Sequence, residues 1–118
     1  MVLCICLCTY CTNEKAKTPD GLYSKEQMAV FLKDLYLLES KVKDLKLKKD
    51  SAKVIYDYYE KQLYAKHQMN DSIYRESFKY YVKDIDQLND IYAIITDSLS
   101  LEERLAVPQE PTPDKKVK

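Results

Sequence analysis

Apolar residues recur every three or four positions along four stretches of the chain, the spacing that places side chains on one face of an α-helix. In the last stretch the repeat is formed by Leu88, Ile91, Tyr92, Ile95 and Leu99. The other three stripes are Met28, Phe31, Leu32, Leu35, Leu38, Val42 and Leu45; Ala52, Ile55, Tyr56, Tyr59 and Leu63; and Tyr74, Ser77, Phe78 and Tyr81. The pattern predicts four helices, at residues 25–47, 51–67, 71–82 and 85–103.

Polar residues at the start of each predicted helix can cap its free backbone N–H groups. Ser24 followed by Gln27 has the pattern of a capping box. The candidate caps of the later helices are Asp50, then Asn70 or Asp71, then Asp84 or Asp86. Neither glycine nor proline interrupts residues 46–51, so a break there and one continuous or kinked helix both fit the sequence. Lysines in this segment suit the carbonyl end of a helix and favour the break.

Short links between the predicted helices favour neighbours that fold back on one another. We therefore predict an all-α fold, a small bundle of three to four antiparallel helices at residues 24–106. Residues 74–99 contain two of these helices, and we expect the others to pack on that stretch. Residues 12–23 form a linker with a turn at Pro19-Asp20-Gly21, and residues 107–118, with three prolines, form a disordered tail.

A family resemblance appears in the second half of the chain. The spacing Tyr74-x-x-Ser77-x-x-Tyr80-Tyr81, followed by Leu88-x-x-Ile91-Tyr92, resembles the F-x-x-S-x-x-Y-Y … I-Y signature of the family called domain of unknown function 4296. Residues 66–70, Lys-His-Gln-Met-Asn, are similar to its K-H-G-I-T turn, and residues 19–22 leading to Met28 and Asp34 are similar to its opening. Gln68 stands where a turn glycine is usual, and Ile85 stands where a proline often begins the last helix.

The resemblance covers roughly residues 19–105. It implies a small helical bacterial lipoprotein of the kind typical of the Bacteroidetes, without an established activity.

Composition agrees with a folded helical domain. Apolar residues make up 46% of the chain, with a single glycine and eleven tyrosines. Nineteen basic and nineteen acidic residues leave a net charge of zero. A nucleic-acid-binding protein normally has a basic excess that neutralises phosphates, so we expect no nucleic-acid partner.

All four cysteines, Cys4, Cys6, Cys8 and Cys11, lie in an apolar segment at residues 1–11. The segment is too short to span a bilayer and suits the apolar region of a secretory signal. We expect a lipoprotein-type signal with Cys11 as the lipidation site, because a polar tether follows it directly; Cys8 is the second choice. An uncleaved apolar tail, or a soft-metal or redox site made by the cysteines, are the alternatives.

The tyrosines have two interpretations. Tyrosines on helical stripes form a thin core whose hydroxyls reach its edge, where each finds a hydrogen-bond partner. Alternatively, Tyr58, Tyr64 and Tyr80 form a stacking or glycan-binding surface. The candidate interaction surface for a protein partner comprises Tyr64, Phe78, Tyr80, Tyr81, Ile85 and Tyr92.

Catalytic chemistry has no visible pattern in this sequence. His67, the only histidine, lacks the spaced partners of a metal site and suits the carbonyl end of the second helix. The serines lack the glycine context of a nucleophile elbow, and no glycine-rich loop could cradle a phosphate. We expect no enzyme activity, no catalytic or metal residues, no cofactor and no small-molecule substrate.

The sequence therefore predicts a lipid-anchored protein of the bacterial cell envelope that faces the periplasm. Its expected role is non-enzymatic binding or scaffolding, and its expected partners are the membrane, through the anchor, and an unidentified envelope protein. A soluble helical adaptor or chaperone-like protein is one alternative. Another is a metal- or glycan-binding module that uses the N-terminal cysteines or surface tyrosines.

Overall fold

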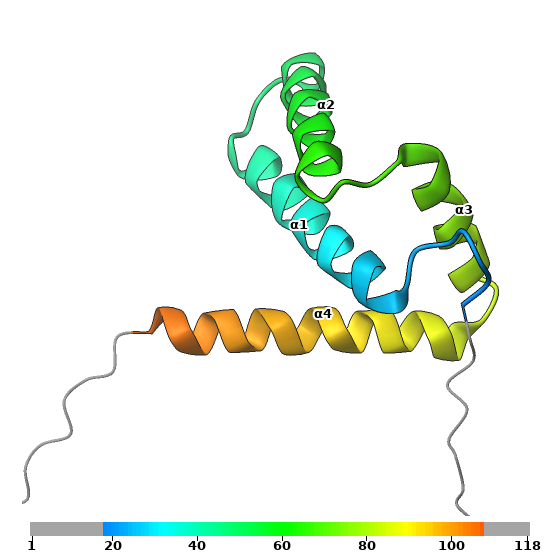
Figure 1. The fold of residues 1–118 in the computed structure, drawn as a ribbon. Coiled ribbons are helices and arrows are strands. Elements are labelled where there is room, and N and C mark those ends of the chain that lie inside the picture. Colours follow the sequence, from blue (N-terminus) through cyan, green and yellow to red (C-terminus); the bar gives the residue numbers. More distant parts are fainter. Residues whose placement is uncertain (1–17, 108–118) are drawn as a thin grey trace, which may run out of the picture.

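The structure is a computed structural model that describes residues 18–107. Within these residues the chain forms four α-helices and no β-strand (Figure 1). They are α1 (Lys25–Asp44), α2 (Lys49–Lys66), α3 (Asp71–Tyr81) and α4 (Ile85–Ala106). The predicted all-α class is confirmed, and the chain breaks between the first two helices. The expected lipidation cysteines and most of the predicted C-terminal tail lie outside the described residues.

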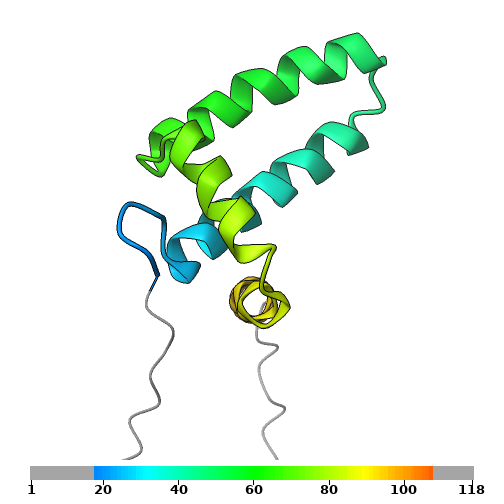
Figure 2. The same cartoon turned by 90° about the vertical axis from the view of Figure 1, so that its right-hand side faces the viewer.

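The first helix holds the arrangement together, because α1 contacts each of the other three helices. It runs antiparallel to α2, and the two form a hairpin (Figure 2). The long helix α4 crosses α1 near its amino-terminal end, and α3 connects the hairpin to α4 (Figure 1). The prediction that residues 74–99 are the packing surface of the other helices is therefore wrong for α2, which packs mainly against α1.

The core is small and lies where α1, α3 and α4 meet. Its buried cluster comprises Met28, Ala29, Leu32, Tyr81, Ile91 and Ile95. Five of these six residues belong to the predicted stripes, so the periodicity identified the inward faces correctly. Leu45, Tyr59, Tyr92 and Leu99, also on the stripes, are exposed. No residue of α2 is fully buried.

Helix starts follow the predicted caps in three of four cases. The Ser24 hydroxyl and the Gln27 side chain form the capping box of α1, Asn70 caps α3 and Asp84 caps α4. The prediction that Asp50 caps the second helix is wrong: α2 begins earlier, and its N-cap residue Lys48 makes no side-chain cap hydrogen bond.

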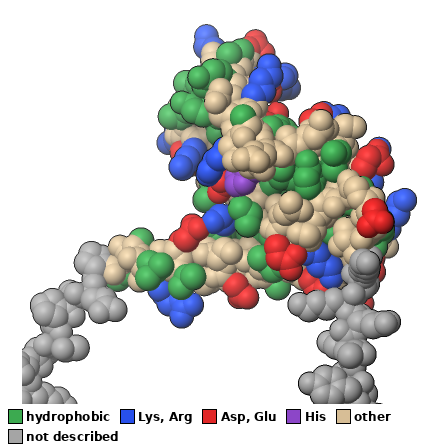
Figure 3. All heavy atoms as spheres, in the orientation of Figure 1, with side chains coloured by type: hydrophobic (Ala, Val, Ile, Leu, Met, Phe, Trp, Pro, Cys, Tyr) green, Lys and Arg blue, Asp and Glu red, His purple; other side chains and the backbone are tan. Residues whose placement is uncertain are grey.

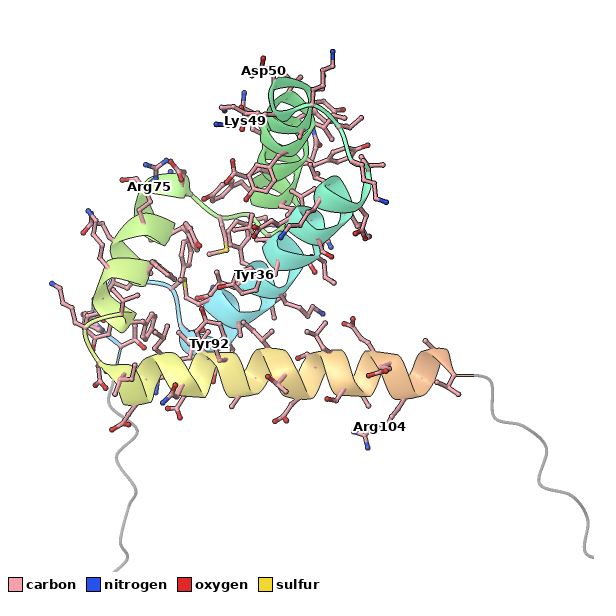
Figure 4. All side chains as sticks on the ribbon, turned by 180° about the vertical axis from the view of Figure 1, so that it is seen from behind. Tyr36, Lys49, Asp50, Arg75, Tyr92 and Arg104 are labelled. Atoms are coloured by element: carbon pink, nitrogen blue, oxygen red, sulfur yellow. The ribbon has the colours of Figure 1, made fainter. Side chains whose placement is uncertain are left out.

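Ion pairs and a tyrosine pair border the contact between α1 and α4. Lys25 Nζ lies 2.7 Å from Asp90 Oδ2, and Lys33 pairs with Glu102. The hydroxyls of Tyr36 and Tyr92 are 2.9 Å apart, with the two rings stacked (Figure 4). These contacts fix which face of α1 is directed toward α4.

Tyr23, just before α1, is bonded to α3 through three of its polar groups. Its backbone N–H donates to Ser77 Oγ at 2.9 Å, and its carbonyl accepts from the Tyr81 hydroxyl at 2.9 Å. Its own hydroxyl accepts from the Asn70 N–H at 2.7 Å. Ser77 Oγ in turn donates to the Ile73 carbonyl. We call Tyr23, Ser77 and Tyr81 the Tyr23 clamp, since together they fix the entry of the chain into α1.

Three turns have a residue with backbone torsions in the left-handed region, at Gly21, at Lys46 (φ +50°) and at Gln68. Gly21 has φ +88° at the third position of the predicted turn, where the Leu22 N–H donates to the Pro19 carbonyl. Gln68 has φ +52°, and the backbone bonds from Gln68 to Ala65 and from Met69 to Tyr64 make a Schellman motif after α2. Glycine is the preferred residue at this position, because a β-carbon is disfavoured there.

We expect Gln68→Gly to raise the free energy of unfolding by about 1 kcal/mol, because it removes the cost of a left-handed L-residue. Urea denaturation monitored by circular dichroism measures the change. The matched control is Gln62→Gly within α2, which should lower stability by about 1 kcal/mol. Equal losses from the two variants would contradict the assigned torsion.

We expect Tyr81→Phe to lower the free energy of unfolding by about 1 to 2 kcal/mol, because the Tyr23 carbonyl loses its buried donor. The control is Tyr58→Phe on α2, whose side chain is exposed and should tolerate the change within about 0.5 kcal/mol. The same denaturation experiment compares them. A Tyr81→Phe variant as stable as the control would show that the bond from the Tyr81 hydroxyl to the Tyr23 carbonyl does not stabilise the fold.

Candidate functional site

The predicted interaction surface does not form in full. Tyr81 is completely buried, because its hydroxyl is the donor of the Tyr23 clamp, so its assignment to a surface is wrong. Tyr80 packs edge-to-face against Tyr81 and is half-buried. Ile85, at the first position of α4, and Tyr92 are exposed.

The other two members, Tyr64 and Phe78, belong to a separate aromatic cluster with Phe31 and Tyr74. Ring centroids are 4.8 Å apart for Phe31 and Tyr64 and 5.0 Å apart for Phe31 and Tyr74. Tyr74 also contacts Phe78, at 6.2 Å. This cluster ties the end of α2 to α1 and α3, so these rings pack the helices together.

Among the buried and half-buried tyrosines of residues 18–107, the hydroxyls of Tyr23, Tyr64 and Tyr81 have hydrogen-bond partners within the protein. The Tyr64 hydroxyl donates to Asp71 Oδ1 at 3.0 Å. Burial is the main cause that raises the pKa of Tyr64, and this hydrogen bond is the second. Burial also raises the pKa of Tyr74 to about 12. The hydrogen-bonded hydroxyls of Tyr23, Tyr64 and Tyr81 support the interpretation of these three tyrosines as parts of a thin core with polar edges. Tyr58 is exposed and contacts only Tyr59 among the aromatic pairs of residues 18–107.

A groove on the α1–α2 hairpin has a volume of about 690 Å³. We call it the α1–α2 groove. Its lining is mainly apolar, and Figure 3 shows hydrophobic side chains gathered over the hairpin with lysines around them. The lining residues are Asp34, Leu37, Leu38, Lys41, Val42, Leu45, Ile55, Tyr59, Gln62, Leu63 and Lys66.

The groove exists because two antiparallel helices bury only the strip along which they meet. Domains normally cover such a hairpin with a further layer of structure. Here α4 lies against α1 through Lys25, Lys33 and Tyr36. The groove is lined by Asp34, Leu38, Lys41 and Leu45, which helical periodicity places on the other side of α1. No described helix covers that side.

Asp34 links the wall of the groove to the end of α2. Its Oδ2 atom lies 2.7 Å from Lys66 Nζ and 2.9 Å from His67 Nε2. Burial raises the pKa of the Asp34 carboxyl, but the hydrogen bonds from Lys66 and His67 outweigh it and hold the pKa below its usual value. His67 ends α2 as predicted, yet its ring bonds Asp34 rather than a terminal carbonyl.

The sequence interpretation missed both the groove and the Asp34–His67 contact. Six groove residues (Leu38, Val42, Leu45, Ile55, Tyr59 and Leu63) lay on the predicted stripes, where they were assigned to the core. The sequence signal for the groove was Leu37, which lies next to Leu38 of the first stripe. This additional leucine widens the apolar face of α1 beyond what α2 alone can cover.

Among residues 18–107, no group of three or more His, Cys, Asp or Glu side chains is placed to hold a metal ion. In the same range, every helix is too short or too polar to cross a bilayer. The cysteines of the alternative metal or redox site lie outside this range.

We expect the Asp34 contacts to make stability pH-dependent in acid. Because the folded pKa of Asp34 lies below its ordinary value of 3.8, its contribution is present above about pH 4 and is lost as the pH falls through the folded pKa. Urea denaturation from pH 6 to pH 3 should show a smaller loss for Asp34→Asn than for the parent. Asp20→Asn, at an exposed turn residue, should follow the parent curve. Parallel curves for all three proteins would refute the assignment.

Comparison with known proteins identifies a family. The sequence profile described as Domain of unknown function (DUF4296) matches residues 19–104, which include α1, α2, α3 and nearly all of α4. No curated protein and no solved structure is significantly similar to the chain. The match also contains the Tyr23 clamp, whose Ser77 and Tyr81 are the residues of the resemblance noted in the sequence. Since the profile covers most of the 118 residues, the chain belongs to the DUF4296 family.

Proposed function

We propose that this chain is a lipid-anchored protein of the bacterial cell envelope that faces the periplasm and binds another envelope component without catalysing a reaction. The observation that carries the binding role is the α1–α2 groove, an apolar hollow of about 690 Å³ that no described helix covers. Exposed apolar surface is costly in water and is typical of interaction sites. The groove replaces the predicted tyrosine surface as the binding face.

The chemistry of the groove favours binding over catalysis. Its lining is mainly aliphatic, and its charged members are Asp34, Lys41 and Lys66. Asp34 accepts hydrogen bonds from Lys66 and from His67, so Asp34 and Lys66 are already engaged within the protein. Within residues 18–107, the His67 ring has Asp34 as its only hydrogen-bond partner, so it is not hydrogen-bonded to a hydroxyl as the base of an activated nucleophile would be. An apolar trough of this kind suits a helix.

The position of the groove also suits an anchored protein. The described chain starts at Thr18, which lies 3.1 Å from the Tyr81 hydroxyl near the end of α3. The turn of the α1–α2 hairpin lies at the end of α1 that is far from Thr18 (Figures 1 and 2). With α1 about 30 Å long, an anchor at Cys11 holds the groove away from the membrane surface and accessible to a partner.

One experiment in living cells tests both parts of the proposal. A photoreactive phenylalanine analogue replaces Leu37 in the groove, in the otherwise unchanged chain and in a Cys11→Ser chain. We expect the unchanged chain to have a lipid on Cys11 by intact mass, to fractionate with membranes and to form a discrete crosslinked product. Cys11→Ser should lose the lipid and leave the membrane fraction, whereas Cys8→Ser should keep both properties.

The control for the groove is the same analogue at Ile73 on α3. Leu37 and Ile73 are equally exposed, at 37% and 38%, so a product specific to Leu37 reflects the groove rather than access of the probe. Equal products at the two positions would refute the groove as the binding face. An unlipidated protein with residues 1–11 intact would refute the anchor.

A further inference from the structure

The carboxyl-terminal end of α4 has an apolar face that the rest of the chain leaves uncovered. Along the apolar side of α4 the exposed fraction rises from 0% at Ile91 and 6% at Ile95 to 38% at Leu99 and 77% at Leu105. Leu101 is also exposed. Figure 1 shows the reason, because this part of α4 projects beyond the other helices, and Figure 3 shows hydrophobic side chains on it. We call residues 97–106 the α4 end.

The α4 end and the α1–α2 hairpin have opposite charge. Asp97, Glu102 and Glu103 outnumber Arg104 on the α4 end, whose position Figure 4 marks with Arg104. The turn of the hairpin, residues 41–49, has five lysines and one aspartate. Glu102 pairs with Lys33 of its own chain, whereas Asp97, Glu103 and the groove residue Lys41 are exposed.

The two surfaces also match in length and in chemistry. The α4 end is about 15 Å long, and the α1 wall of the groove, from Asp34 to Leu45, is about 17 Å long. One surface is the exposed apolar part of an amphipathic helix, which Glu102 joins to its own α1, and the other is an apolar trough between two helices, the usual acceptor of such a helix. The groove opens on the side of α1 that faces away from the chain's own α4, so the α4 end cannot fill it within one molecule.

We propose that the α4 end of one copy of this chain docks in the α1–α2 groove of a second copy. This inference rests on the proposed function, since it names the partner of the same groove. Docking covers Leu99, Leu101 and Leu105 with the aliphatic lining of the groove and places Asp97 and Glu103 near the lysines of the hairpin turn. Because every copy has both surfaces, two copies can exchange their α4 ends reciprocally and cover both grooves.

Charge favours the groove of a second copy over two other partners of the α4 end, a second α4 end and an anionic membrane. Two α4 ends packed against each other would bring their acidic residues together, and like charges at close range repel. An anionic membrane surface would likewise repel the α4 end. The basic hairpin of a second copy attracts it.

The test uses the full chain in its native cells, with the photoreactive analogue at Leu37. We expect a product of twice the chain's mass. Two charge reversals, Asp97→Lys with Glu103→Lys on the α4 end, should reduce that product about tenfold, the size expected for two exposed charge pairs. Lys41→Glu with Lys46→Glu on the hairpin should reduce it equally. The two variants are then co-expressed with different tags, and only the hairpin variant has the analogue. The crosslinked product between them should be restored, because the reversed charges of the two surfaces are again opposite.

The control reversal is Glu26→Lys, at an exposed residue of the first turn of α1, which should leave the product unchanged. Circular dichroism of each variant verifies that helix content is retained. Restoration in the co-expressed pair supports docking between copies. Loss of product without restoration would overturn it, as would a product insensitive to both reversals.

The mass of the product separates this inference from the proposed function. A Leu37 product containing a different protein would overturn the second copy as the partner and leave the groove as the binding face. The absence of any Leu37 product would overturn both. A membrane surface would replace the second copy as the partner if three results came together. The purified chain would bind anionic vesicles, the Lys41→Glu, Lys46→Glu variant would not, and no product of twice the chain's mass would form in cells.

Discussion

The packing of α1 on two sides is the constraint on which the remaining structure depends. Met28 and Leu32 face the buried cluster with α3 and α4, while Phe31 and Val42 lie toward α2. Because α2 has no fully buried residue, its position depends on its packing against α1 and on the aromatic cluster at its end. Regions with few buried apolar contacts open locally at low cost, so the hairpin is the part of the fold best suited to adjust to a partner.

Polar groups complete what the small core cannot supply. The Tyr23 clamp satisfies a backbone N–H and a carbonyl just before α1 with the side chains of Ser77 and Tyr81. A leucine at Ser77 would leave the Tyr23 N–H without this acceptor, and a leucine at Tyr81 would leave the Tyr23 carbonyl without this donor, which is costly in a buried place. Ser77 and Tyr81, the serine and tyrosine of the family resemblance, thus have a physical role: they hold the segment before α1 in place against α3.

The helices could be predicted from the sequence because their signals are local. Spacing of three and four identified the inward faces, and Ser24, Asn70 and Asp84 marked helix starts that the structure confirms. Asp50 failed as a cap because the backbone itself begins α2 at Lys49, two residues before the predicted start. The groove could not be predicted in the same way. Periodicity shows which face of a helix is apolar, as for Leu38 and Leu63, but whether another helix covers that face depends on the crossing of α1 and α4, a long-range property.

An anchor and a self-complementary pair of surfaces would reinforce each other. Confinement of chains to one membrane raises their effective concentration, and a weak contact between copies then becomes populated without any added interface. The α4 end offers only a few apolar side chains, with Leu105 the most exposed, so its contact with a groove is a small interface of the kind that needs this help. The exposed lysines of residues 41–49 remain in water beside that contact, where salt screens their attraction for Asp97 and Glu103. In the proposed assembly, association between copies would therefore depend on their density in the membrane and on ionic strength together.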